Sequence, residues 1–313
     1  MKPRELLVLI VLGGTWGSSF LFIKVAVDDL SPLMLVEGRM LLGAVTVVLA
    51  TYALGLSLPR SRRLWLDVTI MAVFSNVVPF ALISWAEQHI ASGTASVLNA
   101  SMALFTAMLA PLFIAEEGMT TTRAAGLLTG FLGVAVFSGA DLTDIFGSSA
   151  LGELAVVAAA ACYAVGAVFT RLRLRGEHPL TITAGQLVSG VVLLAPVAAV
   201  VGARDGISLH VDSGLSMLAL GVVNTGFAYV TYLWLLAHAG AVKASLVTYV
   251  IPVTGLLLGW AVLDETVGPA AIGGLVLIVA GVTLVNRAAL RQPRPATDAV
   301  EPLLDKERPI RSP

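Results

Sequence analysis

Long apolar runs dominate the chain. Ten of them are close to the ~20 residues that a helix needs to cross the hydrocarbon core of a membrane, and short polar loops separate them. Several runs are apolar on all sides, which suits helices that face lipid and other helices. The runs are continuous and do not alternate, so they exclude a membrane β-barrel. The predicted spans are residues 5–27, 33–53, 66–86, 91–115, 121–139, 151–171, 180–201, 213–236, 242–263 and 268–286.

The two halves of the chain repeat each other. Matching residues recur at a spacing of 147 (Pro32/Pro179, Gly38/Gly185, Gly43/Gly190) or 148 (Asn76/Asn224, Glu117/Glu265, Gly126/Gly274, Gly133/Gly281). Each half holds five spans, and an odd number means that the second copy enters the membrane upside down. Inverted repeats are typical of alternating-access transporters, whose site lies where the copies meet. The prediction is an all-α membrane protein of ten transmembrane helices, built as two inverted five-helix repeats around a central cavity.

The repeat also sets the predicted domain boundaries. Residues 1–145 form the first five-helix repeat, residues 146–286 form the second, inverted repeat, and residues 287–313 form a tail. The tail is rich in proline and charge, so we expect it to be disordered and cytoplasmic. The first apolar run follows two basic residues as in a signal peptide, but it is long and belongs to the repeat, which favours a membrane span.

Composition and charge agree with a membrane protein and orient it. Hydrophobic residues make up 57% of the chain and charged residues 12%, against about 25% charged in soluble domains. Of the 19 Lys and Arg residues, 16 fall on one side of the predicted bundle. The positive-inside rule then predicts a multi-pass protein of the cell membrane with both termini in the cytoplasm. The loops around Arg62 and Arg173 lie inside in this topology, and those around Asp144 and Asp205 lie outside.

Three stretches carry a resemblance to a known family. They are GGTWGSSFLFIKVAVDDLSPLMLVEGRMLLGAV, ASGTASVLNASMALFTAMLAPLFIAEEGMTTTRAAGLLTGFLGVAVF and AGAVKASLVTYVIPVTGLLLGWAVLDETVGPAAIGGLVLIVAGVTLV. These resemble the EamA-type repeat of the drug/metabolite transporter superfamily, over about residues 5–286. The chain departs from the pattern at Ala103, where the family usually has a proline in the fourth helix. Pro252 keeps that feature in the ninth helix, so a kink in helix four is expected to be displaced or absent.

The resemblance implies a ten-helix transporter that exports small metabolites such as amino acids by alternating access. Efflux of lipophilic toxic compounds and import of a nutrient remain alternatives, as does a scaffold or sensor without transport. We expect a small-molecule substrate, the lipid bilayer as surroundings, no nucleic acid, and a monomer or homodimer. The glycine pairs Gly126/Gly130 and Gly255/Gly259 could pack helices within one protomer or between two.

Polar residues inside apolar spans mark the candidate cavity, because burying them in lipid is costly. Asn76 and Asn224 are equivalent in the repeat, and we expect both to face a shared cavity near the midplane. A hydrogen bond between helices is the structural alternative for each amide. Asn99 in the fourth span and Tyr249 in the ninth are expected nearby.

Aromatic residues give the walls of this candidate site. Trp16 and Tyr163 are repeat equivalents in spans one and six, and Trp85 lies one residue out of register with Tyr232. We therefore predict the substrate-binding set Trp16, Asn76, Trp85, Asn99, Tyr163, Asn224 and Tyr249. An interfacial aromatic belt is the alternative for Trp85.

Few charged residues near the membrane are candidates for proton coupling or catalysis. Glu37 could exchange a proton, although pairing with Arg39 or Lys24 is favoured. Glu117 and Glu265 end helices four and nine and are interpreted as end-caps or gate contacts. No His, Cys or acidic cluster has metal-ligand spacing, and no histidine or lysine lies deep in a span to activate a serine. We therefore predict a protein that is not an enzyme and uses no cofactor or metal.

Overall fold

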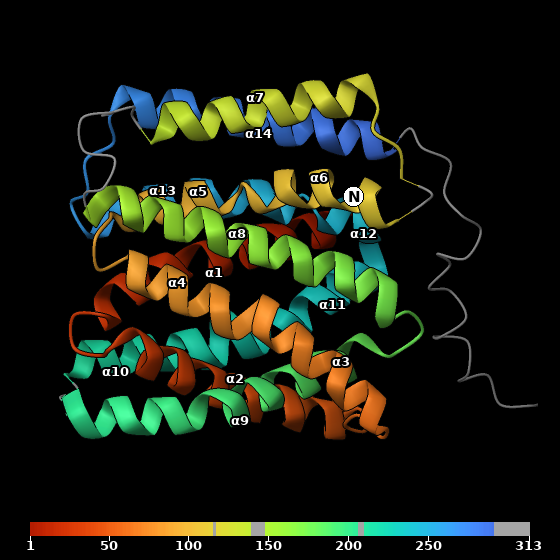
Figure 1. Cartoon of the computed structure of the whole chain (residues 1–313), viewed down its shortest axis with the longest axis vertical. Helices are drawn as coiled ribbons and strands as arrows, with labels where there is room; N and C mark the ends of the chain where they lie inside the picture. Colours follow the sequence, from red (N-terminus) through yellow and green to blue (C-terminus); the bar gives the residue numbers. More distant parts are fainter. Residues whose placement is uncertain (115–116, 139–147, 206–209, 291–313) are drawn as a thin grey trace, which may run out of the picture.

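The computed structural model describes residues 1–114, 117–138, 148–205 and 210–290, and all regular structure in these ranges is helical (Figure 1). Within these ranges, eight helices are long and apolar enough to cross a membrane. Two shorter apolar helices, Thr121–Phe137 and Val247–Val262, accompany them. The protein is therefore a multi-pass helical membrane protein.

Several predicted spans consist of two or three consecutive helical segments. The wide turns of a π-helix, η1 and η2, interrupt the third and eighth spans. The segments are α1 Pro3–Ala26, α2 Pro32–Ala53, α3 Arg62–Ala72, η1 Val73–Val77, α4 Val78–Ala86, α5 Ser92–Asn99, α6 Met102–Phe113, α7 Thr121–Phe137, α8 Ser148–Arg173, α9 Pro179–Asp205, α10 Val211–Leu218, η2 Ala219–Phe227, α11 Ala228–Ala239, α12 Ala241–Ala244, α13 Val247–Val262 and α14 Pro269–Leu290.

Local sequence explains where these helices start and stop. Proline opens α1, α2, α9 and α14, where its missing N–H would have had no partner in any case. The hydroxyls of Ser61 and Thr120 cap α3 and α7 by accepting backbone N–H groups. Gly240, with φ of 80°, ends α11. α14 continues to Leu290, which is beyond the predicted start of the tail at residue 287. The remainder of the predicted tail, and the loop around Asp144, lie outside the described residues.

The fourth span is broken even though it lacks the expected proline. α5 ends at Asn99, and a tight turn follows in which Ser101 N–H donates to Leu98 O (3.0 Å) before α6 begins at Met102. The second copy breaks at Ser245, between α12 and α13. At a spacing of 148, Ala100 corresponds to Thr248. The break in the first copy is therefore present, and it lies three residues later than the corresponding break in the second copy.

The helices run roughly side by side, with α7 and α14 paired at one edge and α2 and α9 at the opposite edge (Figure 1). The remaining helices lie between these two pairs. Contacts between the halves come in matching sets: α1 packs against α13 as α8 packs against α6, and α2 packs against η2 as α9 packs against η1. In repeat register, each contact is the counterpart of the other.

Glycines allow close helix contacts within this chain. A Cβ on Gly126 would lie 2.8 Å from Gly281 O, across the α7–α14 contact. A Cβ on Gly255 would lie 2.4 Å from the Ser96 Cβ of α5. Both predicted glycine pairs thus pack helices of the same protomer.

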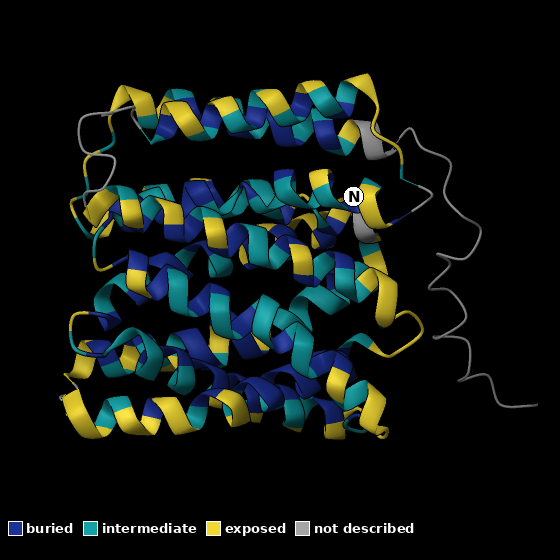
Figure 2. Cartoon of the chain, viewed as in Figure 1, coloured by how far each residue is buried: buried dark blue, intermediate teal, exposed yellow. Residues whose placement is uncertain are grey.

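Burial follows the arrangement of the helices, with buried residues inside and exposed ones along the outer faces (Figure 2). Many of the exposed residues are large and apolar, such as Leu49, Leu128, Val192, Val200 and Trp260. Apolar surface this extensive needs a nonaqueous cover, which the acyl chains of a bilayer provide.

Candidate functional site

A buried arginine lies where helices of both halves meet. Arg39, on α2, is 8% exposed. Its Nε donates to the hydroxyl of Thr225 on η2 (3.0 Å), and its Cζ lies 4.0 Å from the centre of the Phe80 ring on α4. The ring face attracts the cation through its quadrupole. Three elements, two from the first half and one from the second, therefore hold one charged side chain.

Aromatic side chains extend this site towards α1. The phenols of Tyr163 on α8 and Tyr229 on α11 lie within electrostatic range of Arg39. Tyr163 also approaches Phe80, with ring centres 6.5 Å apart. Trp16 on α1 lies 6.3 Å from Tyr229 in an edge-on arrangement, the geometry that aromatic pairs prefer. We refer to the group as the Arg39 cluster: Trp16, Arg39, Asn76, Phe80, Tyr163, Thr225 and Tyr229.

Asn76 brings an unpartnered amide to the cluster. It lies in η1 and is fully buried, and neither its Oδ1 nor its Nδ2 has a hydrogen-bond partner among the described residues. Its polar neighbour is the Tyr229 hydroxyl, which is within interaction range without forming a hydrogen bond of ordinary geometry. A buried polar group without a partner is costly, and π-helical turns are frequent at functional sites. Asn76 is therefore a candidate ligand-binding residue.

Asn224, the repeat equivalent, is used differently. Its Nδ2 donates to the Thr15 carbonyl and to the hydroxyls of Ser18 and Ser19 (3.0 Å each), all on α1. Trp16 Nε1 in turn donates to the backbone carbonyl of Asn224 (3.1 Å). The Asn224 side chain thus links η2 to α1. This is the hydrogen bond between helices that the sequence offered as the structural alternative for this residue.

The other predicted site residues are more dispersed. The Oδ1 of Asn99, at the end of α5, is buried and without a partner among the described residues. The Tyr249 hydroxyl on α13 accepts a hydrogen bond from Asn286 on α14 (2.8 Å). Trp85 is 37% exposed and packs on His89 near the end of α4, outside the Arg39 cluster. The structure thus brings Trp16, Asn76 and Tyr163 together and places Trp85 elsewhere.

The expected pairing of Glu37 with Arg39 or Lys24 is wrong. Lys24 Nζ donates instead to the carbonyls of Glu87 (2.5 Å) and Ile90 (3.0 Å), and one Glu37 oxygen is buried without a partner among the described residues. Residues two apart on a helix point in different directions, which separates Glu37 from Arg39. Glu37 lines a recess of about 240 Å³ between α2 and α9.

Glu87 is a buried acid that the sequence reasoning missed. It directly follows α4, is 0% exposed, and neither carboxylate oxygen has a hydrogen-bond partner among the described residues. Burial raises the pKa of this carboxyl well above its usual value, which favours the neutral form. An acid in a short loop next to an apolar span is a weak sequence signal, because most such residues face water. Among the described residues, no group of three or more His, Cys, Asp or Glu side chains could hold a metal ion.

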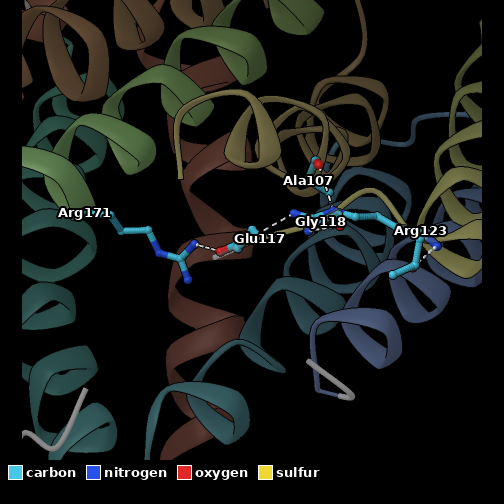
Figure 3. A network of polar contacts seen from close by, with 6 residues as sticks. Ala107, Glu117, Gly118, Arg123 and Arg171 are labelled. Carbon is cyan, nitrogen blue, oxygen red and sulfur yellow. Dashed lines mark hydrogen bonds and ion pairs between the residues drawn. The ribbon is translucent and has the colours of Figure 1, made fainter. Parts of the chain in front are cut away.

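The two repeat-related glutamates have different partners. Glu265 accepts hydrogen bonds from the backbone N–H groups of Ser92 (2.6 Å) and Gly93 (2.9 Å), and so caps the start of α5 from the other half. Glu117 pairs with Arg123 of α7 (2.7 Å) and with Arg171 of α8 (Figure 3). Both contacts link separate helices, as expected for end-caps or gate contacts.

Comparison with known proteins places the chain in a family. The EamA-like transporter family matches it twice, over residues 4–139 and again over residues 150–287. The chain belongs to this family. One match falls in each half of the sequence.

Relatives with similar sequences are named as transporters. The chain is 27% identical to the uncharacterized transporter YoaV of Bacillus subtilis, covering 85% of this chain and 91% of that one. It is 28% identical to a probable terminal-alkyne amino-acid exporter of Streptantibioticus cattleyicolor, covering 93% and 95%. It is also 28% identical to the uncharacterized inner membrane transporter YedA of Escherichia coli, covering 91% and 93%.

The fold is similar to that of a solved protein. A crystal structure that is 20% identical in sequence superposes with a TM-score of 0.66, covering 93% of this chain and 100% of the other. The helical arrangement described above is therefore one that is known from experiment.

Proposed function

We propose that this EamA-family protein exports small polar metabolites, such as amino acids or their analogues, across the cell membrane. The observation that carries the proposal is the Arg39 cluster, where both halves of a transporter-family chain enclose a cation and an unpartnered amide between aromatic rings. Charged and amide groups suit a polar cargo better than a lipophilic one. The amino-acid exporter among the relatives supports this substrate class. The cargo crosses without chemical change, so no enzymatic step is involved.

Alternating access is the mechanism we propose. The α1–α13 contact corresponds to the α8–α6 contact, and the α2–η2 contact corresponds to the α9–η1 contact. This correspondence supports ten membrane helices in two inverted five-helix repeats. Spans one to five would rock against spans six to ten around the Arg39 cluster. At one end of the bundle, α5 packs against α13 and is capped by Glu265. In the repeat, α12 corresponds to α5 and α6 corresponds to α13. Within the described residues, α12 and α6 pack together less closely than α5 and α13 do. This asymmetry supports a path that opens at one end of the bundle at a time.

Transport can be tested in proteoliposomes that contain the purified protein. Uptake and counterflow would be measured for a panel of amino acids, toxic amino-acid analogues and cationic dyes, with empty liposomes as the control. Transport of amino acids or analogues is the expected result. The aromatic rings of Trp16, Tyr229 and Phe80 also suit a lipophilic cargo, so transport of dyes without amino acids would refute the proposed substrate class.

Topology is tested separately by labelling single cysteines. We propose that both termini and Arg173 are cytoplasmic and that Arg204 lies near the outer face, following the positive-inside rule. In a Cys162→Ser background, a cysteine at position 204 should react with a membrane-impermeant maleimide in intact cells. A cysteine at position 173 should react only after the cells are permeabilised. Labelling of position 173 in intact cells would contradict the orientation.

A further inference from the structure

Arg39 is a buried cation with spare hydrogen-bond donors. It lies about two turns into α2, and the ion pairs of the described residues all involve other side chains. A guanidinium has five N–H donors. In the described structure only the Nε of Arg39 has an acceptor, the Thr225 hydroxyl. The four N–H groups on its terminal nitrogens are available for another acceptor.

The nearest candidate counter-ion does not fill this role. Glu87 lies within electrostatic range of Arg39. However, both Glu87 oxygens are buried and make no hydrogen bond to any described residue, so no hydrogen bond joins the two side chains. A charged side chain inside a membrane is costly and usually marks a substrate or ion pathway.

Two neighbours hold the guanidinium of Arg39 in place. Phe80 covers one face of the guanidinium and Thr225 holds the Nε edge. The side-chain atoms that are fully enclosed and unpartnered include those of Asn76 and Glu87 but not the terminal nitrogens of Arg39. The terminal nitrogens belong to a residue that is 8% exposed as a whole. They form the planar fork that matches the two oxygens of a carboxylate.

We propose that Arg39 binds the carboxylate of the cargo through both terminal nitrogens, and that the Asn76 amide binds a second polar group of the same molecule. This inference rests on the export function proposed above and narrows its substrate class to small monocarboxylates, amino acids included. Tyr163 and Tyr229 flank the carboxylate site, and Trp16 continues the wall beyond Tyr229. Arg39 and Asn76 come from α2 and η1 of the first half, and Thr225 and Tyr229 from the second half.

A purely structural role makes a different prediction. Arg39 would then only tie α2 to η2 through Thr225, and removing either partner would weaken the fold without changing which ligands bind. Arg123 is a second buried arginine that lies outside the Arg39 cluster and bonds to Ala107 and Glu117, so Arg123→Gln is the matched control for Arg39→Gln.

The test compares carboxylic acids with their amides on purified protein. Thermal unfolding midpoints would be measured with each of twenty L-amino acids, lactate and benzoate, and with the carboxamide of every compound. We expect at least one acid to stabilise the wild type more than its amide does. In Arg39→Gln the apparent affinity for that acid should fall by about tenfold or more, whereas that for its amide should change little. Arg123→Gln should keep the preference for the acid.

Several results would overturn the site. It is refuted if no acid stabilises the wild type more than its amide, a comparison that needs no variant. It is also refuted if Arg39→Gln keeps the preference. Should Arg39→Gln fail to fold, Arg39→Lys retains the charge without the planar fork and should show a reduced preference. Transport separates the two proposals: acid binding through Arg39 without transport of any acid would refute export alone, and equal transport of acids and amides would refute the carboxylate site alone.

Discussion

The contact between α7 and α14 gives the sharpest prediction about stability, with Gly281→Ala as the perturbation. A Cβ at Gly281 would lie 2.5 Å from the Cα of Gly130 and 2.6 Å from the carbonyl oxygen of Gly126. Ordinary contact begins at 3.4 Å, so the shorter of these distances falls 0.9 Å short. Both obstructing atoms belong to the backbone and cannot rotate away, so the helices must separate. Overpacking of this kind costs about 1–3 kcal/mol.

Gly273→Ala on the same helix is the matched control, because a Cβ there meets nothing within 4 Å. Both changes gain about the same helix propensity, ~1 kcal/mol, so the difference between the variants isolates the packing term. Thermal unfolding of the detergent-solubilised variants would be monitored by size-exclusion chromatography. We expect the thermal midpoint of Gly281→Ala to lie roughly 2–10 °C below that of Gly273→Ala. Equal midpoints would refute the close α7–α14 contact.

Three further predictions concern polar residues. Asn76→Leu should reduce transport more than folded yield, whereas Asn224→Leu should lower the thermal midpoint by losing its contacts with α1, each worth about 0.6 kcal/mol; the opposite pattern would contradict the two roles. Although burial raises the pKa of Glu117, the hydrogen bonds and charges of Arg123 and Arg171 lower it overall, below the ordinary 4.5. Its stabilisation is thus present above about pH 4.5 and lost as the pH falls through the lowered pKa, so thermal midpoints should show wild type and Glu117→Gln converging in acid. Glu37→Gln should keep substantial pH-driven uptake in proteoliposomes, and its loss with substrate exchange intact would identify Glu37 as the coupling group.

Sequence reasoning located the helices well because the cost of exposing backbone in lipid forces apolar runs into helices. It could not locate the break at Ala100, because a tight turn there replaces the expected proline. It also favoured a pairing of Glu37 with Arg39 or Lys24, which the structure does not show. A spacing of two residues on a helix argues against the pairing of Glu37 with Arg39. The rotation of α4, which exposes Trp85 and buries Phe80, depends on packing against α2 and α8, which span composition does not encode.

The candidate site was therefore predicted only in part. Repeat equivalence identified Asn76, Asn224, Trp16 and Tyr163 as positions of interest. Equivalence in sequence does not require equivalent bonding, however. Asn224 meets the serines and threonine of α1, and Asn76 meets no such partner among the described residues.

The different partners of the two glutamates have a consequence for the resting orientation of the carrier. If the halves exchange conformations, Glu117 would take over in the opposite state the capping that Glu265 performs here. The exchange is unequal, because Glu117 would first have to release Arg123, whereas the residue that corresponds to Arg123 beside Glu265 is Ala271. The residue that corresponds to Ser92 is Gly240, which offers no hydroxyl. Under the proposed alternating access, the two orientations would therefore differ in free energy without any cargo or gradient, and differences between the two copies at a few positions would set which way the empty protein faces.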